Sequence, residues 1–320
     1  MLADGREALA GGGAIPVRAP GAAAGAGAAE TAFANAESLY AAGADSAAAV
    51  AYEAALAAAP GGWSHRSRAV ESMLFALDRA GAYRHEAESA LRHLDALGST
   101  SSAGNIVSLG LEAALQVPPA EPGRAELTGA LETRARAIAA DRGLSMAADD
   151  RSAVYIALLD ARHDAADSAG ARTVAEQWST FLDSEAQRAP TADARAVFDS
   201  HRLSAYMELG RPERALPMLE SSDRSMPDDY NPPARLAVAY RELKRWPDAL
   251  AASDRALARA YGPRMLGMYG VRTDIFLGMA DTTSARATLD RAIATAEGFP
   301  AGQRSERTIS ALRKRLDSLR

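Results

Sequence analysis

The C-terminal half of the sequence repeats itself at a spacing of 34 residues, and Tyr206 and Tyr240 mark the repeat most clearly. When residues 206–216 are aligned with residues 240–250, six of the eleven positions are identical. A period of this length is typical of arrays in which each unit is a pair of helices joined by a short turn. Such arrays bury their core by stacking neighbouring units, which leaves one long face open to a partner. The matching positions are Tyr206/Tyr240, Glu208/Glu242, Leu209/Leu243, Arg211/Arg245, Ala215/Ala249 and Leu216/Leu250.

The composition favours a chain built from helices alone. Alanine is abundant and aromatic residues make up only 6% of the sequence, which suits closely packed helices better than a β-sandwich or barrel. Runs of β-branched residues with period-two alternation are nearly absent, which argues against a sheet. A chain of 320 residues is long for one small core, whereas an array grows by adding units. We therefore predict an all-α, right-handed superhelical solenoid of antiparallel helix pairs, about seven in number.

Glycine and proline punctuate the predicted array, which occupies residues 29–299. Gly43 and Gly62 stand where the end of a helix requires a residue that tolerates a positive φ angle, and Pro60 ends a helix. The turn of the fourth pair is irregular, and the third and fourth pairs depart from the common length. The predicted pairs occupy, in chain order, roughly residues 30–60, 73–98, 106–142, 155–188, 192–225, 232–260 and 265–297.

The two ends of the chain differ from the array. Residues 1–28 consist largely of glycine, alanine and proline, so they are expected to form a flexible lead. An alternative is that residues 2–17 are the frayed end of a hairpin from another domain, because Asp4-Gly5 is a turn signal. Residues 300–320 carry one apolar stripe and predict a capping helix, which covers the stacking face of the last repeat. The stripe consists of Ile309, Leu312, Leu316 and Leu319.

Charge and residue usage exclude several classes of function. The net charge of −5 gives no support to a nucleic-acid surface. The absence of cysteine excludes disulfides, thiolate zinc sites and cysteine nucleophiles. His85 and His93 are too far apart for a one-turn pair of metal ligands, and no nucleophile elbow or phosphate-binding loop occurs. We therefore predict no catalytic residue, no metal and no cofactor.

The sequence as written predicts a cytoplasmic protein. No run approaches 18 apolar residues, so no membrane span is expected. The start of the chain lacks the basic residues and apolar run of a secretory signal. A periplasmic or envelope location remains an alternative in case a signal is missing from the sequence.

Small residues recur on the second helix of each predicted pair. They are spaced seven apart, so two turns separate residues on one side of the helix and neighbouring helices can approach closely. In the first helices an aromatic residue stands nine positions before the small residue that opens the second helix. The small pairs are Ala48/Ala55, Ala130/Ala137, Ala249/Ala256 and Ala285/Ala292, and the aromatics are Tyr206, Tyr240 and Phe276.

This combination resembles the tetratricopeptide repeat. The resemblance covers residues 30–297 as a trend and is closest over residues 192–297. The third and fourth repeats lack the aromatic residue, so their register stays open. The matching residues are Ala36, Ala48, Tyr52, Ala55 and Pro60 in the first repeat, Tyr206, Ala215 and Pro227 in the fifth, and Ala237, Tyr240, Ala249 and Ala256 in the sixth.

The resemblance implies a concave face, lined by the first helices, that receives a peptide or helix of another protein. Some members of the family hold a terminal carboxylate with lysine and asparagine, but Ala234 and Val238 stand at those positions here, so no such clamp is expected. Arg235 and Arg241 could bind an acidic segment. The alternative is that both are solvated or paired within the chain with Glu242 or Asp228. The candidate groove residues are His201, Ser204, Met207, Glu208, Asn231, Arg235, Val238, Arg241 and Glu242.

These observations favour a non-enzymatic scaffold that binds a protein or peptide partner and is a monomer or a weak homo-oligomer. Two alternatives remain at this stage. The array could be the regulatory or docking part of a larger enzyme or signalling protein whose catalytic domain lies upstream of Met1. It could also be an envelope-associated scaffold that lacks its signal sequence.

Overall fold

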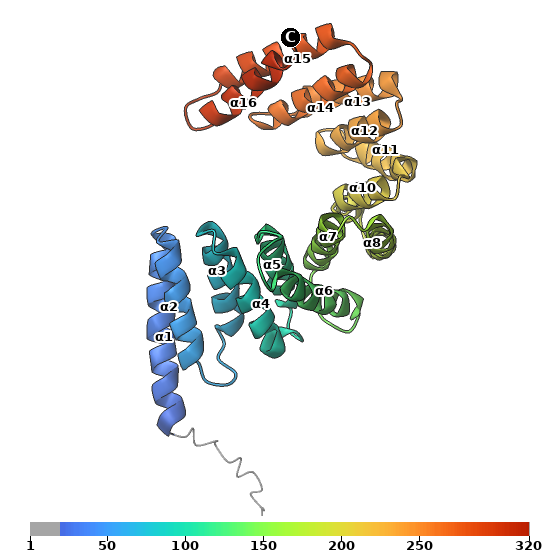
Figure 1. The fold of residues 1–320 in the computed structure, drawn as a ribbon. Helices are drawn as coiled ribbons and strands as arrows, with labels where there is room; N and C mark the ends of the chain where they lie inside the picture. Colours follow the sequence, from blue (N-terminus) through green and yellow to red (C-terminus); the bar gives the residue numbers. More distant parts are fainter. Residues whose placement is uncertain (1–19, 320) are drawn as a thin grey trace, which may run out of the picture. The chain divides into compact units, whose positions relative to one another are not determined.

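The structure is a computed structural model that describes residues 20–319, with side chains from residue 27 onward. Every regular element in this range is a helix, which confirms the predicted all-α fold (Figure 1). The chain divides into two compact units, Met1–Met146 and Ala147–Arg320. The first unit contains α1 (Pro20–Ala41), α2 (Asp45–Ala58), α3 (Arg66–Arg79), α4 (Tyr83–Leu97), α5 (Ala103–Gln116) and α6 (Arg124–Ala140).

The second unit holds the remaining helices. Two of its helices interrupt the simple pairing. The short α9 (Ala192–Ala196) precedes α10, and a 3-10 turn, η1 (Pro212–Ala215), opens the partner helix of α10. The other elements are α7 (Ala148–Asp164), α8 (Ser168–Arg188), α10 (Asp199–Glu208), α11 (Leu216–Ser225), α12 (Asn231–Glu242), α13 (Trp246–Arg259), α14 (Arg264–Gly278), α15 (Thr282–Glu297) and α16 (Glu306–Asp317).

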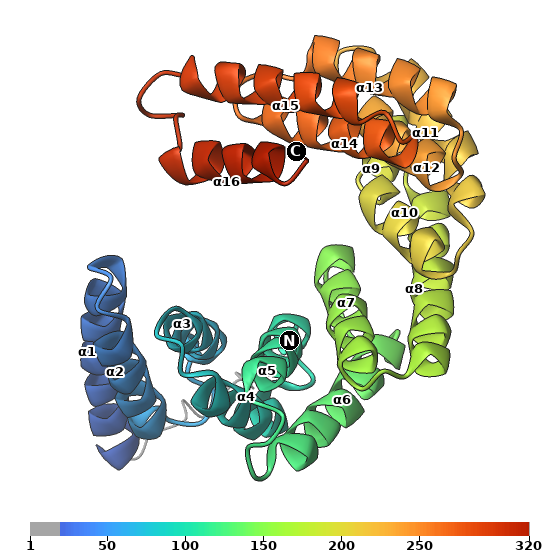
Figure 2. The same cartoon turned by 45° about the horizontal axis from the view of Figure 1, so that its top comes forward.

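Apart from the short α9, the helices of the described residues form seven antiparallel pairs followed by one single helix. The pairs are α1/α2, α3/α4, α5/α6, α7/α8, α10 with η1 and α11, α12/α13 and α14/α15. Within the second unit, Figure 2 shows α12 to α15 stacked side by side. The boundary between the two units falls between the third and fourth pairs, whose lengths depart from the common repeat in the sequence. The predicted single array is therefore divided at that point.

The two ends of the described chain are formed by α1 and α16. The first helix, α1, begins at Pro20, so residues 20–28 of the predicted flexible lead are helical. The physical reason is that the run from Ala22 to Ala29 is rich in alanine, which has the highest helix propensity. The remainder of the predicted lead, residues 1–19, lies outside the described residues. At the other end α16 packs on α15 and buries Ile309, while its role as a cap stays a prediction.

One turn geometry joins the two helices in six of the seven pairs. A residue with positive φ ends the first helix, and the amide after it donates to a carbonyl five residues earlier, as in a Schellman motif. In the first pair Gly43 has a φ of 73°, and the amide of Ala44 donates to the carbonyl of Leu39 at 2.9 Å. The third pair differs because Pro118 and Pro119 lengthen its connection. The positive-φ residues are Gly43, Gly81, Ala166, Gly210, Lys244 and Ala280.

The two tyrosines that mark the sequence repeat join neighbouring pairs. Tyr206 of α10 is 2% exposed, and its hydroxyl donates to a carboxylate of Asp183 on α8 at 2.5 Å. Tyr240 of α12 does the same with Glu220 of α11 at 2.8 Å. Each aromatic ring therefore fills the space between two pairs, while its hydroxyl remains hydrogen-bonded to the preceding second helix. A buried hydroxyl without such a partner would be costly, so ring and carboxylate recur together.

The small residues of the second helices lie at the closest helix contacts, with one exception. Six of the eight predicted alanines are completely buried, namely Ala48, Ala55, Ala249, Ala256, Ala285 and Ala292. The prediction is wrong for Ala130 and Ala137 of α6, because Ala137 is exposed. Helix α6 instead buries a stripe of larger residues at helical spacing, and this moves the register of the third repeat. That stripe is Leu127, Leu131, Ala135 and Ile138.

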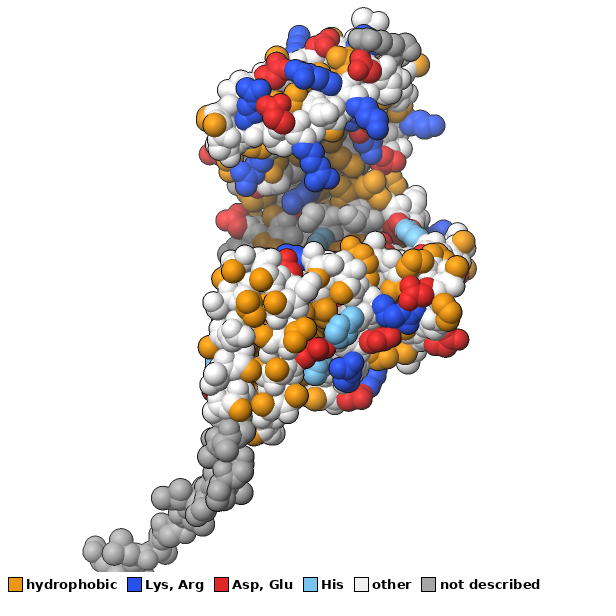
Figure 3. Space-filling view, turned by 60° about the vertical axis from the view of Figure 1, so that its left-hand side comes forward, with side chains coloured by type: hydrophobic (Ala, Val, Ile, Leu, Met, Phe, Trp, Pro, Cys, Tyr) orange, Lys and Arg blue, Asp and Glu red, His pale blue; other side chains and the backbone are white. Residues whose placement is uncertain are grey.

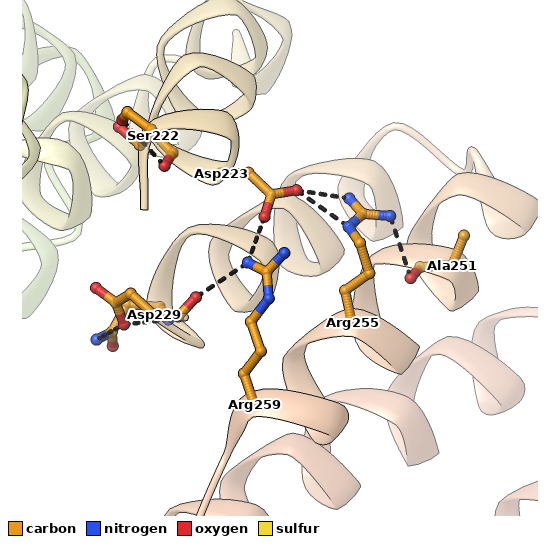
Figure 4. Close-up of polar contacts among 8 residues, drawn as sticks. Ser222, Asp223, Asp229, Ala251, Arg255 and Arg259 are labelled. Carbon is orange, nitrogen blue, oxygen red and sulfur yellow. Dashed lines mark hydrogen bonds and ion pairs between the residues drawn. The ribbon is translucent and has the colours of Figure 1, made fainter. Parts of the chain in front are cut away.

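Charged side chains add a second tie between successive pairs of the second unit. Asp223 of α11 pairs with Arg259 of α13 at 2.6 Å and with Arg255 at 3.0 Å, as Figure 4 shows. Arg259 also donates to the backbone carbonyl of Asp229, in the connection that leads into α12. Only 13% of the Asp223 side chain is exposed, so these contacts are stronger than an ordinary surface ion pair. These ion pairs therefore link α11 and α13, the second helices of two successive pairs.

Candidate functional site

The nine residues of the candidate groove lie on two adjacent helices of the second unit. His201, Ser204, Met207 and Glu208 belong to α10, while the other five belong to α12. These are the first helices of successive pairs, and they pack against each other. The two sets are therefore neighbours. Some of these nine side chains form hydrogen bonds or ion pairs within the chain, and others do not.

Ion pairs occupy the C-terminal end of α12. Arg241 binds Glu242 at 2.6 Å and reaches Asp274 of α14 at 3.3 Å. Arg315 of the cap helix α16 binds the same Asp274. Of the two alternatives for Arg241, the structure shows pairing within the chain, which ties α12, α14 and α16 together. Arg241 and Glu242 therefore hold the array rather than present a free charge.

Four other candidates also make contacts inside the unit. Glu208 lies 2.6 Å from the Nε2 atom of His163 on α7, and the amide of Asn231 donates to Asp229 at 2.8 Å. Met207 and Val238 are partly buried and pack against the apolar core that contains both repeat tyrosines. Their side chains can still form the floor of a groove, but they are not isolated surface positions. Only Ser204 is exposed without a side-chain contact of these kinds.

The N-terminal halves of α10 and α12 hold polar groups of a different kind. The Nδ1 atom of His201 is buried and has no hydrogen-bond partner. Arg235 of α12 is half-buried and, among the described residues, forms no hydrogen bond or ion pair; it acts on His201 and Asp199 only through its charge. The His201 ring lies 5.8 Å from that of Trp178. Burial lowers the pKa of His201, so the imidazole is kept neutral.

A buried carboxylate supports this end of the site. Asp199 is 1% exposed and accepts a hydrogen bond from Ser222 of α11 at 2.6 Å. Burial raises the pKa of Asp199, while the nearby arginines, including Arg235, oppose that shift. Sequence analysis did not single out Asp199 or Trp178 for this site, because neither stands at a position that the repeat pattern marks. The set of His201, Ser204 and Arg235 can bind an anionic group, with a guanidinium as the principal donor.

Similarity to known proteins agrees with this architecture. Residues 206–270 match the family model described as tetratricopeptide repeat, and this range runs from the last turn of α10 through η1, α11, α12 and α13 into the first half of α14. The chain contains tetratricopeptide repeats. This confirms the resemblance to the tetratricopeptide repeat that was based on Tyr206, Tyr240 and the recurring alanines. Tetratricopeptide repeats are protein–protein interaction modules and are generally non-catalytic, so the chain has the architecture of a scaffold.

Solved structures extend the similarity beyond the matched repeats. A tetratricopeptide repeat protein from Parabacteroides merdae ATCC 43184 is similar over 91% of this chain and 99% of its own, with a TM-score of 0.54 and 11% identity. At this identity the similarity concerns the fold alone. The TPR2AB domain of yeast Sti1 in its pHSP90 complex matches over 90% of this chain and 98% of its own at 15% identity. Its TM-score of 0.33 is too low to bear on fold or function. No curated protein matches the sequence significantly.

The outer surface of the first unit shows only scattered apolar side chains. Figure 3 shows small apolar side chains scattered over the outer surface of the first unit, where α1 and α2 expose many alanines and Val50. Single exposed apolar residues of this kind are common and do not define a site. No helix among residues 20–319 is long and apolar enough to cross a membrane. Within the same range, no group of three or more histidine or acidic side chains could hold a metal ion.

Proposed function

We propose that the second unit binds a segment of a partner protein along the face formed by α10 and α12. The observation that carries this proposal is the contrast between the two ends of that face. Arg241 is paired within the chain, whereas among residues 20–319 Arg235 has no hydrogen bond or ion pair and the buried Nδ1 atom of His201 has no partner. Buried polar groups are almost always satisfied in native proteins, so the buried nitrogen of His201 favours a partner from outside, and the half-buried guanidinium of Arg235 lies near enough to act on the same ring.

The chemistry of these groups favours an acidic partner segment. A guanidinium binds a carboxylate through two parallel hydrogen bonds, which gives both affinity and orientation. The neutral imidazole of His201 and the hydroxyl of Ser204 can each add one hydrogen bond. Met207 and Val238 lie beside them and supply an apolar floor for the rest of the segment. We therefore infer a peptide or helix with an Asp or Glu side chain that reaches Arg235, flanked by apolar residues.

A photo-crosslinking amino acid at Ser204 tests the location of the binding face. Ser204 is exposed on α10, and the matched control position is Arg224, which is exposed on the second helix α11. In cells of the native host, we expect a protein to be crosslinked from position 204 and not from position 224, and mass spectrometry identifies the segment. Equal crosslinking from both positions, or none from position 204, would contradict the proposal.

The identified segment, made as a peptide, then tests the chemistry. Arg235→Gln is expected to weaken binding by about tenfold or more, which corresponds to about 1.4 kcal/mol or more. Arg241→Gln is the matched control, because Arg241 is already paired and its loss should change affinity much less. An acidic residue of the peptide replaced by its amide should reproduce the loss in the wild-type protein. If both arginine variants bind as the wild type does, Arg235 is not the anchor.

A further inference from the structure

The first unit contains a cavity with an unusual lining, remote in sequence from the proposed groove. It has a volume of about 360 Å³ and lies between α3, α4 and α5. Each of the three helices contributes one carboxylate, and no arginine or lysine is found among the described residues that line it. The lining residues on α5 stand at positions i, i+3, i+4 and i+7, so they form one stripe along that helix. The lining consists of Phe75, Asp78, Tyr83, Glu86, Leu109, Glu112, Ala113 and Gln116.

The carboxylate of Glu86 has no partner among the side chains that the structure describes. This residue, in the first turn of α4, is only 1% exposed, and its buried Oε2 atom has no hydrogen-bond partner. Asp78 of α3 and Glu112 of α5 face it with charges of the same sign. Desolvation and these two neighbours raise the pKa of Glu86 to about 8. A glutamate that is almost completely buried is normally paired, so Glu86 is an exception that calls for an explanation.

An organic cation explains this lining better than a metal ion does. No group of three histidine or acidic residues among the described residues could hold a metal, so Asp78, Glu86 and Glu112 do not converge on one point. A guanidinium or ammonium group on a flexible stem can reach carboxylates that lie farther apart. Phe75 is 45% exposed beside them, and its ring can contact both the apolar stem and the charged head of such a side chain.

We propose that this acidic pocket, formed by Asp78, Glu86 and Glu112, binds an arginine or lysine side chain of a partner peptide. The charge of the pocket is complementary to such a side chain, and its volume leaves room for one. The helices α3 and α5 are the first helices of adjacent pairs and pack against each other, as α10 and α12 do in the second unit. A peptide lying along α3 and α5 can therefore insert one basic side chain between them. The acidic pocket is independent of the groove proposed above.

Selection from a library of random peptides tests whether the acidic pocket binds a basic side chain. A random dodecapeptide library is displayed and selected on the wild-type chain, with counter-selection on the Glu86→Gln variant. Peptides that bind elsewhere are removed by the counter-selection, because the rest of the surface is unchanged. We expect the surviving peptides to share one arginine or lysine next to apolar residues. Survivors without a shared basic residue, or no survivors at all, would overturn the proposal.

Quantitative binding then tests the charge directly. Replacing the shared arginine by citrulline, which is neutral and of nearly the same shape (or a shared lysine by acetyl-lysine), is expected to weaken binding by about tenfold or more, as is Glu86→Gln in the protein. Glu126→Gln is the matched control, since Glu126 is an exposed glutamate in the first turn of α6 and should leave affinity unchanged. Free arginine amide that binds as tightly as the peptide would show a site for small amines and overturn the proposal. Arg235→Gln should not affect these peptides, so failure here and failure of the second-unit groove are separate outcomes.

Discussion

The buried carboxylate of Glu86 makes a specific prediction about stability, which a single substitution can test. Glu86→Gln replaces a titratable group by a neutral amide of nearly the same size and shape. Near neutral pH the folded first unit keeps Glu86 protonated, whereas the unfolded chain releases that proton, and this difference lowers the free energy of unfolding. The glutamine variant has no proton to release and avoids this loss of stability. We therefore expect Glu86→Gln to stabilise the protein, which is unusual for a change at a residue that is only 1% exposed.

The magnitude follows from the difference between the folded and unfolded pKa values. The usual pKa of the group is 4.5, and burial together with Asp78 and Glu112 raises it to about 8 in the folded chain. Between these values the folded state binds more protons than the unfolded state, so stability falls by about 1.4 kcal/mol for each unit of rising pH. The cost is about 1 kcal/mol at pH 5, about 3 kcal/mol at pH 7 and about 5 kcal/mol at pH 9. Well below pH 4.5 both states are protonated and the cost vanishes.

Hydrogen exchange measured by mass spectrometry on peptides that span α4 is the appropriate assay, because it reports opening of the first unit separately from the second. Wild type and variant are compared at the same pH, so the intrinsic pH dependence of exchange cancels. Exchange in Glu86→Gln should be slower by on the order of a hundredfold at pH 7 and by only a few-fold at pH 5. Glu126→Gln should match the wild type at both pH values. Equal protection of wild type and Glu86→Gln at pH 7 would refute the reasoning.

Three further substitutions test the packing of the repeats. Ala249→Trp adds a large ring at a completely buried contact and should destabilise the second unit by about 1–3 kcal/mol, whereas unchanged melting would show that the repeat register is wrong. Gly110→Ala places a Cβ 2.4 Å from an alanine methyl of the adjacent α4 and should destabilise the first unit by a similar amount in urea denaturation. Its control, Gly129→Ala in α6, meets nothing within 4 Å and should stabilise by about 0.5–1 kcal/mol. Ala280→Gly relieves a φ of 59° and should raise stability by up to about 1 kcal/mol, seen as a higher melting temperature.

The parts of the fold that the sequence predicted well are those where one residue type has one physical role. A buried tyrosine must fill space and keep its hydroxyl bonded, so Tyr206 and Tyr240 recur at constant spacing and their contacts are equivalent. Close helix contacts require alanine, and a turn with positive φ favours glycine, as at Gly43. Each of these requirements restricts the choice of residue strongly, so the pattern survives in the sequence.

The parts that the sequence obscured are those where another residue can carry out the same role at a modest cost. The fourth pair has the common turn, but Ala166 adopts a φ of 52° where glycine was expected, so the turn looked irregular. In α6, larger residues replaced the small ones, and the predicted alanine contact at Ala137 is exposed. The acidic pocket depends on Asp78, Glu86 and Glu112 from three helices, and nothing in their spacing along the sequence brings them together. Such a site becomes visible only once the packing is known.

The stability cost of Glu86 indicates that this residue has a role in binding. A cost of about 3 kcal/mol at pH 7 is a large fraction of the 5–15 kcal/mol that stabilises a typical domain. An alanine or leucine at this position would avoid the cost, so packing alone gives no reason for a carboxylate there. A cation in the acidic pocket favours the charged form of Glu86 and lowers its pKa, which recovers part of the lost stability. Binding should therefore release a proton near neutral pH, and the selected basic peptides should bind more tightly at pH 9 than at pH 6. Affinity that does not change with pH would mean that Glu86 stays neutral when the peptide is bound.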